Sequence, residues 1–332
     1  MKAIIWTNYG SPDVLQQQEI AKPIPKENEL LIKTHAATAF AGDCELRRLD
    51  LPLILRIPLR LYAGIIKPKR IQILGQELSG VVEAVGEKVT KFKVGDAVFA
   101  SAGLSFGAYA EYSCLSEPAV IAHKPANVSF AEAAAIPTGG SEALHYLRAG
   151  KIQTGETILV NGAGGSIGTF VVQLAKHFGA TVTAVDHTDK QELLRSIGAD
   201  KVIDYIREDF ADSDQKYDLV FDSVGKKSFS RCVHVLKPNG RYLLASPSPG
   251  DRARGRRISR ASNKKVISEM VEPTIEDLVY LADLVETGTI KVVIDKRFPL
   301  EQTAEAHRYV ETGKKKGHVI VRITHTDSHQ AD

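Results

Sequence analysis

Apolar and polar residues alternate in two different patterns along the chain. Up to about residue 125, short runs rich in β-branched and aromatic residues lie between turn signals such as Gly86-Glu-Lys and Val94-Gly-Asp, which is typical of strands. The expected strands cover residues 2–7, 29–37, 80–85, 96–100 and 109–114. This part of the chain is predicted to be mostly β.

From Ser129 the pattern of apolar residues is typical of helices instead of short strands. Ser129 and Glu132 have the spacing of a capping box ahead of an alanine-rich helix. Pro137 and the pair Gly139-Gly140 are expected to interrupt the chain before a second helix that runs through Leu147.

Strands and helices then alternate strictly. Strands are expected at 157–160, 181–185, 201–203, 219–222 and 241–245, with helices after Gly168 and at 190–197 and 228–236. This alternation predicts a parallel, doubly wound sheet that closes with the strand at 241–245. Beyond a basic, irregular stretch we expect helices at 275–287 and 301–312, strands at 292–298 and 318–323, and a frayed tail from Thr324.

Composition places the chain among ordinary globular proteins. Its 332 residues are enough for two domains, and a net charge of +3 is too weak a bias to indicate a nucleic-acid partner. Cys44, Cys114 and Cys232 have no paired spacing, so neither a disulfide framework nor a cysteine zinc cluster is predicted. The first residues resemble a strand, and no apolar run reaches membrane-spanning length. A reducing cytoplasm is the expected location.

A glycine-rich turn follows the strand at 157–160. The pattern Ala163-x-Gly165-x-x-Gly168, between a strand and a helix, is typical of a dinucleotide-binding βαβ unit, where the backbone approaches a pyrophosphate at the helix N-terminus. A glycine turn that serves only packing is the alternative. The predicted contacts to the cofactor in this turn are Gly162, Ala163, Gly164, Gly165, Ser166, Ile167 and Gly168.

The end of the second strand of this unit bears on the choice of cofactor. Asp186 lies 18 residues after Gly168, near the offset at which a carboxylate binds the adenosine ribose. A carboxylate there repels a 2′-phosphate, so Asp186 favours NADH over NADPH. The alternative is that Asp186 only caps the helix that follows.

Motifs spread over nearly the whole chain carry a family resemblance. They are Lys2-Ala-Ile-Ile with Tyr9-Gly-Ser-Pro-Asp-Val-Leu15, Gly75-Gln-Glu-Leu-Ser-Gly80, Phe92-Lys-Val-Gly-Asp96, Gly107-Ala-Tyr-Ala-Glu-Tyr112, Leu236-Lys-Pro-Asn-Gly240 and Glu305-Ala-His-Arg308. In this order and spacing, the chain resembles the zinc-independent quinone oxidoreductase and enone reductase branch of the medium-chain dehydrogenase/reductase family.

The resemblance implies an α/β chain with a GroES-like, β-rich catalytic domain and a Rossmann domain built on a doubly wound parallel sheet. The implied parts are residues 1–125, GroES-like; 126–265, the nucleotide-binding domain; and 266–332, the return to the catalytic domain. It also implies a homodimer formed through edge strands of the nucleotide domains, around the strand at 292–298 or a neighbour.

The resemblance adds further cofactor contacts. NADPH-using relatives bind the 2′-phosphate with a lysine and a tyrosine that correspond to Lys190 and Tyr205, so NADPH stays possible beside NADH. Val224 and Ser246 complete the predicted cofactor-binding set.

Metal ligands of the alcohol dehydrogenase branch have no counterpart here. Phe40, Gln76 and a position near Thr138 stand where the resemblance would place the catalytic zinc ligands. None of these is a good zinc ligand, so no metal site is predicted and oxidation of simple alcohols is disfavoured.

The remaining candidates for catalysis lie in the first domain. Asp43, Tyr62 and Tyr109 are predicted to line the substrate pocket and are the candidate catalytic residues. Asp43 and Arg47 match an acid-x-x-x-Arg pattern of relatives, which fits an ion pair as well as a catalytic role. Phe40 replaces an asparagine common in relatives, and Glu142 stands where relatives often have threonine.

Two basic segments leave alternatives open. Residues 51–70 combine apolar and basic side chains, and a lid over a substrate cleft is favoured over membrane contact because two prolines are expected to break an amphipathic helix. Residues 252–260, with Lys264 and Lys265, lack aromatic residues for stacking on bases, so a mobile loop is favoured over nucleic-acid binding.

Three hypotheses on function follow. The leading one is an NAD(P)H-dependent oxidoreductase that transfers hydride, without zinc, to a small-molecule quinone or α,β-unsaturated carbonyl. The second is an NAD(P)H-binding redox sensor or structural module with little catalysis. The third is a partner of nucleic acid or of a membrane, which the composition disfavours.

Overall fold

The computed structural model describes residues 1–50, 53–225, 228–269 and 271–325 of the chain. The chain packs as two compact units. The first is Met1–Thr138 with Thr274–Glu286 and Ile294–Asp332, and the second is Gly139–Pro273 with Thr287–Val293. The sequence boundaries at 125/126 and 265/266 stay a prediction about functional domains, since packing contacts alone define these units. Most of the tail expected from Thr324 lies outside the described residues.

A mixed sheet of seven strands forms the frame of the first unit. Its strands are β14 (Ile294–Pro299), β15 (His318–Arg322), β3 (Glu29–Ala39), β4 (Glu77–Val85), β5 (Ala97–Ser101) and β7 (Val120–His123) in spatial order, with β6 (Tyr112–Ser116) paired to β3. Only β14 and β15 run parallel. A separate hairpin joins β1 (Lys2–Trp6) to β2 (Leu15–Glu19). The mostly β character predicted for this region is confirmed.

Two strands of this unit were not predicted, and one begins later than expected. β2 reads Leu-Gln-Gln-Gln-Glu and is exposed after its first residue, so neither composition nor alternation indicates a strand. β7 is a short edge strand, and its pairing with β5 defines it. The strand expected at 109–114 starts at Tyr112, because Tyr109 belongs to the loop before it.

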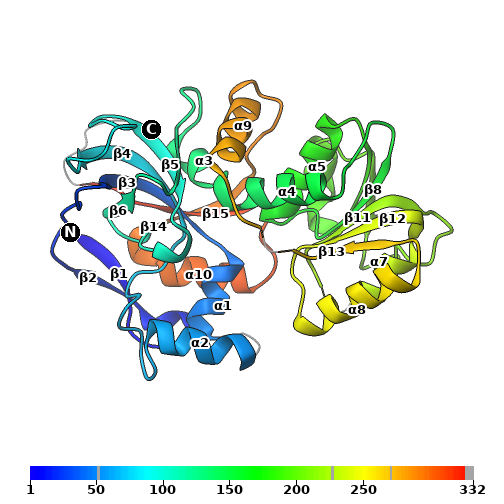
Figure 1. Ribbon diagram of the computed structural model, residues 1–332, viewed down its shortest axis with the longest axis horizontal. Helices are drawn as coiled ribbons and strands as arrows, with labels where there is room; N and C mark the ends of the chain where they lie inside the picture. Colours follow the sequence, from blue (N-terminus) through cyan, green and yellow to red (C-terminus); the bar gives the residue numbers. More distant parts are fainter. Residues whose placement is uncertain (51–52, 226–227, 270, 326–332) are drawn as a thin grey trace. The chain divides into compact units, whose positions relative to one another are not determined.

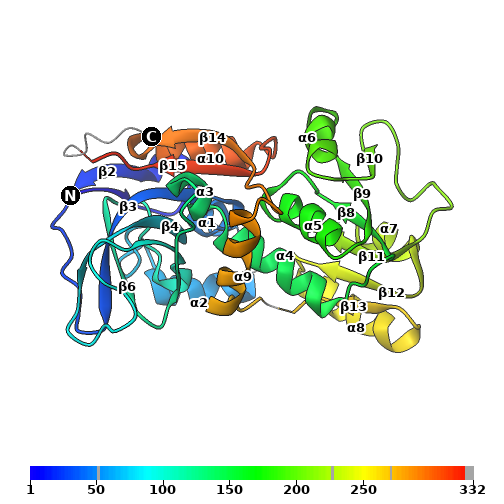
Figure 2. The same ribbon diagram turned by 90° about the horizontal axis from the view of Figure 1, so that it is seen from above.

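Five helices belong to the first unit. They are α1 (Ala41–Arg48), α2 (Leu53–Ala63), α3 (Phe130–Ala134), α9 (Ile275–Glu286) and α10 (Thr303–Glu311). The capping box at Ser129 is confirmed: Glu132 N–H donates to the Ser129 hydroxyl, and Ser129 N–H donates to the Glu132 carboxylate. α10 packs against α1 as well as β3, β14 and β15, as both views show (Figures 1 and 2). Short 3-10 turns lie at Pro12–Val14, Gly103–Ser105 and Leu300–Gln302.

The expectation that prolines prevent a helix within residues 51–70 is wrong. α2 runs through Pro58 without a break between Leu53 and Ala63. Pro52 lies outside the described residues. Proline lacks the N–H that would bond to the carbonyl four residues before it, so Pro58 leaves one carbonyl of the first turn without its helical partner. Pro58 lies only five residues after the start of α2.

The second unit is a six-stranded parallel sheet with helices on both faces. The spatial order is β10 (Lys201–Asp204), β9 (Thr181–Asp186), β8 (Thr157–Asn161), β11 (Tyr217–Asp222), β12 (Leu236–Leu244) and β13 (Lys265–Ile267). In chain order this is 3-2-1-4-5-6, the order of doubly wound dinucleotide-binding folds. α5 (Ser166–His177) lies on one face, and α7 (Phe229–His234) and α8 (Pro249–Ala261) lie on the other (Figure 1). The predicted fold class is confirmed.

Three local predictions in this part of the chain are wrong. The sheet does not close at β12, because β13 pairs with it in parallel. The basic run at 252–260 is no loop: it lies in α8, where Ser248 and Asp251 form a capping box that the sequence analysis overlooked. Gly139 and Gly140 do not separate two helices, because α4 (Pro137–Ala149) starts at Pro137, a position suited to proline, and contains both glycines.

The predicted dimer interface assigned the strand at 292–298 to the sheet of the nucleotide domain, and this assignment is wrong. β14 is an edge strand of the first unit's sheet and pairs with β15. The edge strands of the nucleotide sheet are β10 and β13. A dimer formed through that sheet would therefore use one of these two strands.

Candidate cofactor and catalytic site

The glycine turn joins β8 to α5 and is held closed by backbone hydrogen bonds. Gly162, with φ of 82°, and Ala163 both donate their N–H groups to the carbonyl of Val185, at 3.1 and 3.2 Å. A Cβ atom on Gly162 would lie 2.4 Å from Ser223 Oγ, and one on Gly168 would lie 2.3 Å from the Gly162 carbonyl oxygen. Packing alone therefore requires glycine at both positions.

The same turn has the features of an anion site. α5 begins at Ser166 after the N-cap Gly165, and no side chain caps this end. The first N–H groups of a helix lack intrahelical acceptors, and the helix dipole favours a negative charge beside them. Every residue of the turn from Gly162 to Gly165 is glycine or alanine, so the turn adds no bulky side chain of its own to this anion site.

Asp186 ends β9 and is bound to the glycine turn. Its carboxylate accepts hydrogen bonds from Gly164 N–H at 2.7 Å and from His187 N–H at 2.8 Å. Asp186 is 5% exposed. The carboxylate therefore holds the middle of the turn in place, a role that the sequence spacing did not indicate.

Lys190 neutralises the carboxylate that was expected to select NADH. Its Nζ lies 3.0 Å from Asp186 Oδ1, and Lys190 is 7% exposed. The stem of the same side chain lies over the turn, because a Cβ atom on Gly164 would be 2.5 Å from Lys190 Cδ. The two residues that carried opposite signals for cofactor choice are thus partners in one buried ion pair.

Tyr205 follows β10 beside this pair. Its N–H donates to the Asp186 carbonyl at 3.3 Å, and its side chain is largely exposed. The ring lies edge-on to His187, with ring centroids 6.0 Å apart. Tyr205 therefore belongs to the same cluster as Asp186 and Lys190, at the carboxyl ends of neighbouring strands.

Val224 and Ser246 lie at the carboxyl ends of β11 and β12. A Cβ atom on Gly162 would lie 3.2 Å from the Val224 side chain, and one on Gly225 would lie 3.2 Å from the Ser246 carbonyl. Both residues are exposed. The structure thus brings the predicted cofactor-binding residues together at one edge of the parallel sheet, where ligands of doubly wound folds bind.

Asp222 was missed by the sequence analysis and organises this edge. The fully buried carboxylate accepts hydrogen bonds from the hydroxyls of Ser228 and Tyr242, each at 2.6 Å, and from the Asn161 amide at 3.0 Å. It also accepts the backbone N–H groups of Val224 and Gly225. The sequence predicts Asp222 only as the last residue of a strand. A carboxylate at the carboxyl end of a parallel strand is the signal that could have marked it as part of the site.

Asp43 and Tyr109 form the centre of a buried polar network in the first unit. Both are fully buried, and the Tyr109 hydroxyl lies 2.7 Å from Asp43 Oδ2 and 3.0 Å from the Thr38 carbonyl. Gln76 Nε2 lies 3.5 Å from Asp43 Oδ1, and His307 Nε2 lies 3.2 Å from the Tyr109 hydroxyl. His307 was quoted only within the family motif, and nothing in the sequence placed it beside Asp43.

The network continues from His307 to Arg47. Arg47 Nη1 lies 3.3 Å from His307 Nδ1, and the guanidinium also pairs with Glu311 and donates to the Gly10 carbonyl. Because a guanidinium only donates, His307 Nδ1 is the acceptor and Nε2 carries the hydrogen toward Tyr109. The ion pair expected between Asp43 and Arg47 is replaced by the pair of Arg47 with Glu311 on α10.

Burial shifts the pKa values of the two titratable ends of this network in opposite directions. Burial raises the pKa of the Asp43 carboxyl to about 7, partly offset by the hydrogen bond from Tyr109. Burial, with the Arg47 charge adding to it, lowers the pKa of His307 to about 3. His307 is therefore neutral at physiological pH, while the Asp43 carboxyl is a mixture of its protonated and ionised forms.

Two of the three positions that would carry catalytic zinc, Gln76 and Thr138, lie beside Glu77, and neither is a metal ligand. The buried Glu77 carboxylate accepts from Thr138 N–H at 2.6 Å and from the Thr38 hydroxyl, and burial raises its pKa. The Phe40 ring packs against Gly42, since a Cβ atom there would be 2.6 Å from it. Among the described residues, no group of three or more histidine, cysteine or acidic side chains is arranged to hold a metal ion.

Tyr62 and Glu142 lie on α2 and α4, respectively. Tyr62 is 41% exposed on α2, and the Arg70 guanidinium lies 4.3 Å from its ring centroid. Glu142 is half-buried on α4, one turn before Tyr146, and its charge contributes to the raised pKa of that tyrosine. The catalytic roles of Asp43, Tyr62 and Tyr109 stay a prediction.

Fold and site together define a two-part dehydrogenase. The alcohol dehydrogenase GroES-like domain matches residues 26–126, and the family described as zinc-binding dehydrogenase matches residues 197–321. The chain belongs to the medium-chain dehydrogenase/reductase family, in its quinone oxidoreductase and enone reductase branch.

Individual relatives narrow this class. The chain is 36% identical to 2-methylene-furan-3-one reductase of Solanum lycopersicum, over 97% of this chain and 79% of that protein. It is 35% identical to the NADPH-dependent alkenal/one oxidoreductase, chloroplastic, of Arabidopsis thaliana, with the same coverage. The quinone oxidoreductase structure from Coxiella burnetii superposes with a TM-score of 0.88, at 29% identity, over 98% of this chain and 99% of that one.

Proposed function

We propose that the chain reduces an electrophilic small molecule, a quinone or an α,β-unsaturated carbonyl, with hydride from NAD(P)H. The observation that carries this proposal is the glycine turn at 162–168, with Asp186, Lys190 and Val224 gathered beside it, in a chain whose relatives are named enone, alkenal and quinone reductases. Bound NAD(P)H supplies the hydride. The chain's own residues bind and orient it.

The glycine turn and the N-terminus of α5 hold the pyrophosphate in this proposal. The N–H groups at the start of α5 and the helix dipole meet its charge, and the turn itself adds only glycine and alanine beside it. Asp222 fixes the loop at Val224, and Asp186 fixes Gly164, so both carboxylates hold the cradle in shape. Binding energy from this part of the cofactor positions the reactive ring.

NADH is the proposed preferred cofactor. A 2′-phosphate would need the Lys190 ammonium, which is already paired with Asp186, and it would also meet the charge of that carboxylate. The ribose hydroxyls of NADH carry no such charge. NADPH stays possible, because Lys190 and Tyr205 lie in the same cluster.

The reaction is proposed to proceed without zinc. Phe40, Gln76 and Thr138 offer no thiolate, imidazole or carboxylate for a Lewis-acidic metal. A substrate that is already electrophilic needs no such metal, whereas removal of hydride from a simple alcohol needs a metal or a general base to take up the hydroxyl proton. The acceptor is therefore proposed to be activated by its own conjugated carbonyl.

A panel of acceptors tests the proposed reaction. Nicotinamide absorbance is followed with NADH or NADPH and, in turn, a benzoquinone, a 2-alkenal and a cyclic enone, and with the oxidised cofactor and ethanol. We expect turnover of at least one conjugated carbonyl or quinone and none of the alcohol, with rates unchanged by a chelator. Alcohol oxidation that a chelator abolishes would contradict the proposal. Cofactor binding without turnover of any acceptor would favour the redox-sensing alternative.

A homodimer formed through the nucleotide sheet is proposed as the assembly. β10 and β13 are the edges at which a second copy can extend that sheet. Light scattering should give twice the chain mass of 36.2 kDa at micromolar concentration. A single-chain mass over that range would contradict the dimer.

A further inference from the structure

The exposed side of α2 carries large apolar residues beside its two arginines, which is unusual for a surface helix. Leu59 and Ala63, one turn apart, pack on the core of the first unit. Ile57 and Leu61 lie almost opposite to them on the helix and are 55% and 67% exposed. A helix that packs one side on a core normally turns polar residues outward.

The apolar surface continues past the end of α2. Ile65 and Ile66 follow the helix and are 64% and 85% exposed. Single exposed apolar residues need no explanation, but four large ones within ten residues of one segment do. We call Ile57, Leu61, Ile65 and Ile66 the α2 ridge.

Positive charge surrounds the α2 ridge. Residues 51–75 contain five basic residues and no acidic ones. These five, which we call the basic rim, are Arg56, Arg60, Lys67, Lys69 and Arg70, and all are exposed. The segment is therefore complementary to a surface that is both apolar and anionic.

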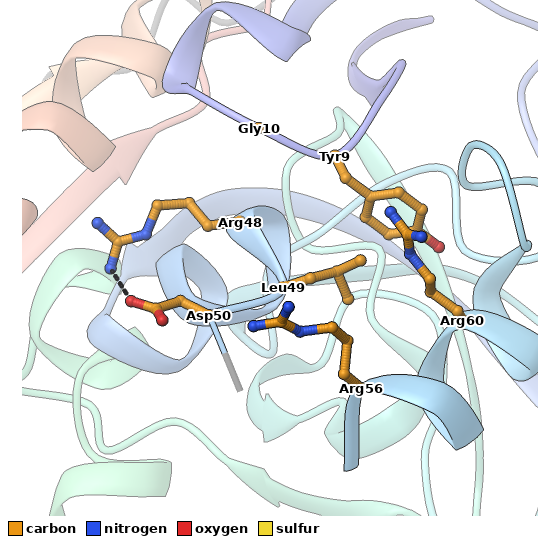
Figure 3. Close-up of a pocket in the computed structure, with 7 residues that line it drawn as sticks. All are labelled: Tyr9, Gly10, Arg48, Leu49, Asp50, Arg56 and Arg60. Carbon is orange, nitrogen blue, oxygen red and sulfur yellow. Dashed lines mark hydrogen bonds and ion pairs between the residues drawn. The ribbon is translucent and has the colours of Figure 1, made fainter. Parts of the chain in front are cut away.

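A cavity of about 480 Å³ opens beside the start of the rim (Figure 3). Three of its lining residues are arginines, and Figure 3 shows Arg60 stacked on the ring of Tyr9 and Arg48 bound to Asp50. Arg56 has no ion-pair partner among the residues that the structure describes. The Tyr9 hydroxyl donates to the Gly64 carbonyl at 2.6 Å, which ties this cavity to the end of α2.

We propose that the α2 ridge and the basic rim dock on an anionic phospholipid bilayer, with lipid phosphates at the arginines of this cavity. The bilayer interface accepts apolar side chains below the headgroups and cations among them, which is the chemistry of this segment. A soluble anion would use the arginines and leave the ridge in water. Among the described residues no helix is long and apolar enough to cross a membrane, so the contact is with its surface.

The expectation against membrane contact rested on the prolines, and α2 forms in spite of Pro58. The docking proposal does not depend on the identity of the acceptor. It places the protein where apolar quinones and alkenals dissolve, whichever of them is reduced.

Co-sedimentation with vesicles tests the docking. The full chain is mixed with vesicles of phosphatidylcholine alone or with 30% phosphatidylserine, at 0.1 M salt. We expect binding to the anionic vesicles only. Arg56→Gln/Arg60→Gln should bind about 30-fold more weakly, from the loss of two charges near the surface. Ile57→Ser/Leu61→Ser should bind at least about tenfold more weakly, from the loss of apolar contact with the interface.

Matched controls keep the test specific. Ile24→Ser/Leu104→Ser removes two apolar residues elsewhere in the first unit that are even more exposed, at 87% and 76%, and Arg256→Gln/Arg257→Gln removes two exposed charges from α8. Both should bind vesicles like the wild type. Equal, negligible binding of the wild type to both vesicle types would overturn the proposal, as would loss of binding only in the α8 variant. Sodium pyrophosphate bound in solution by Arg56 and Arg60, without vesicle binding, would also overturn it.

A fluorescent probe on the ridge gives a second, independent measurement. Trp6 is the one tryptophan of the chain and is 1% exposed, so its emission provides a constant background. Leu61→Trp should be quenched by vesicles whose acyl chains carry bromine, in proportion to vesicle binding. A tryptophan that binds with the vesicles but escapes this quenching would show that the ridge does not enter the interface.

Discussion

Replacing Asp186 by serine is expected to raise the ratio of kcat/KM for NADPH to that for NADH about 100-fold, or nearly 3 kcal/mol. The substitution has two effects. It removes the carboxylate that would repel a 2′-phosphate, and it releases the Lys190 ammonium, which lies 3.0 Å from that carboxylate. The released ammonium is then free to bind the phosphate.

Two further variants separate these effects. Asp186→Asn keeps an oxygen that can accept the Gly164 N–H at 2.7 Å while it removes the charge, so it should shift the preference without loosening the glycine turn. Asp186→Ser/Lys190→Gln should lose most of the gain for NADPH, because the cation is gone. An unchanged ratio in Asp186→Ser would mean that this carboxylate does not discriminate between the cofactors. A full shift in the double variant would assign the effect to repulsion alone.

The nucleotide-binding half of the fold could be predicted because its signals are local. A β-branched strand, a glycine turn and a periodic helix follow one another between residues 157 and 177, and the same unit is repeated behind them. The parallel order of the strands follows from the helices between them. β13 escaped prediction because it has only three residues, and its pairing with β12 defines it.

Predictions at α2 and α8 failed where one local rule was given too much weight. At α2 this rule is that prolines break an amphipathic helix, and at 252–260 it is that a basic run without aromatic residues favours a loop. In α8, the capping box at Ser248 and the packing of Gly255 against Val266 stabilise a helix whose exposed side is mostly polar. A single proline or a run of like charges therefore weighs less than a helix cap and a buried helix side.

Contacts between residues far apart in the chain could not be predicted at the site either. Spacing predicted Asp186 at the end of β9 and Lys190 just after it, but it presented them as opposing signals, and only the structure shows them as one ion pair. His307 on α10 lies 198 residues after Tyr109, which belongs to the loop before β6, and only tertiary packing brings the two together. No pattern in a single sequence carries such a contact.

The buried network of Asp43 and His307 gives the second large prediction. The folding free energy of the wild type relative to Asp43→Asn is expected to change by up to about 4 kcal/mol between pH 4 and pH 7. The pKa of Asp43 is about 7 in the folded protein, against about 3.9 for an unfolded aspartate. The folded state thus holds a proton that the unfolded state has lost. The wild type should lose stability relative to Asp43→Asn as the pH rises through this range, and the difference should level off above it.

His307 is expected to change the free energy of unfolding with pH in the opposite direction to Asp43. The two contributions can therefore be separated only by comparing variants. Its pKa is about 3 in the folded protein, against about 6.5 when unfolded, so its contribution to stability grows as the pH rises toward 6.5. The two slopes offset each other in the wild type. Urea unfolding from pH 4 to 8 should show stability rising with pH in Asp43→Asn, falling in His307→Gln, and changing little from these groups in the double variant. Parallel curves for the wild type and Asp43→Asn would mean that the buried carboxyl does not titrate in this range. The network would then hold α1 and α10 together through hydrogen bonds whose strength does not depend on pH.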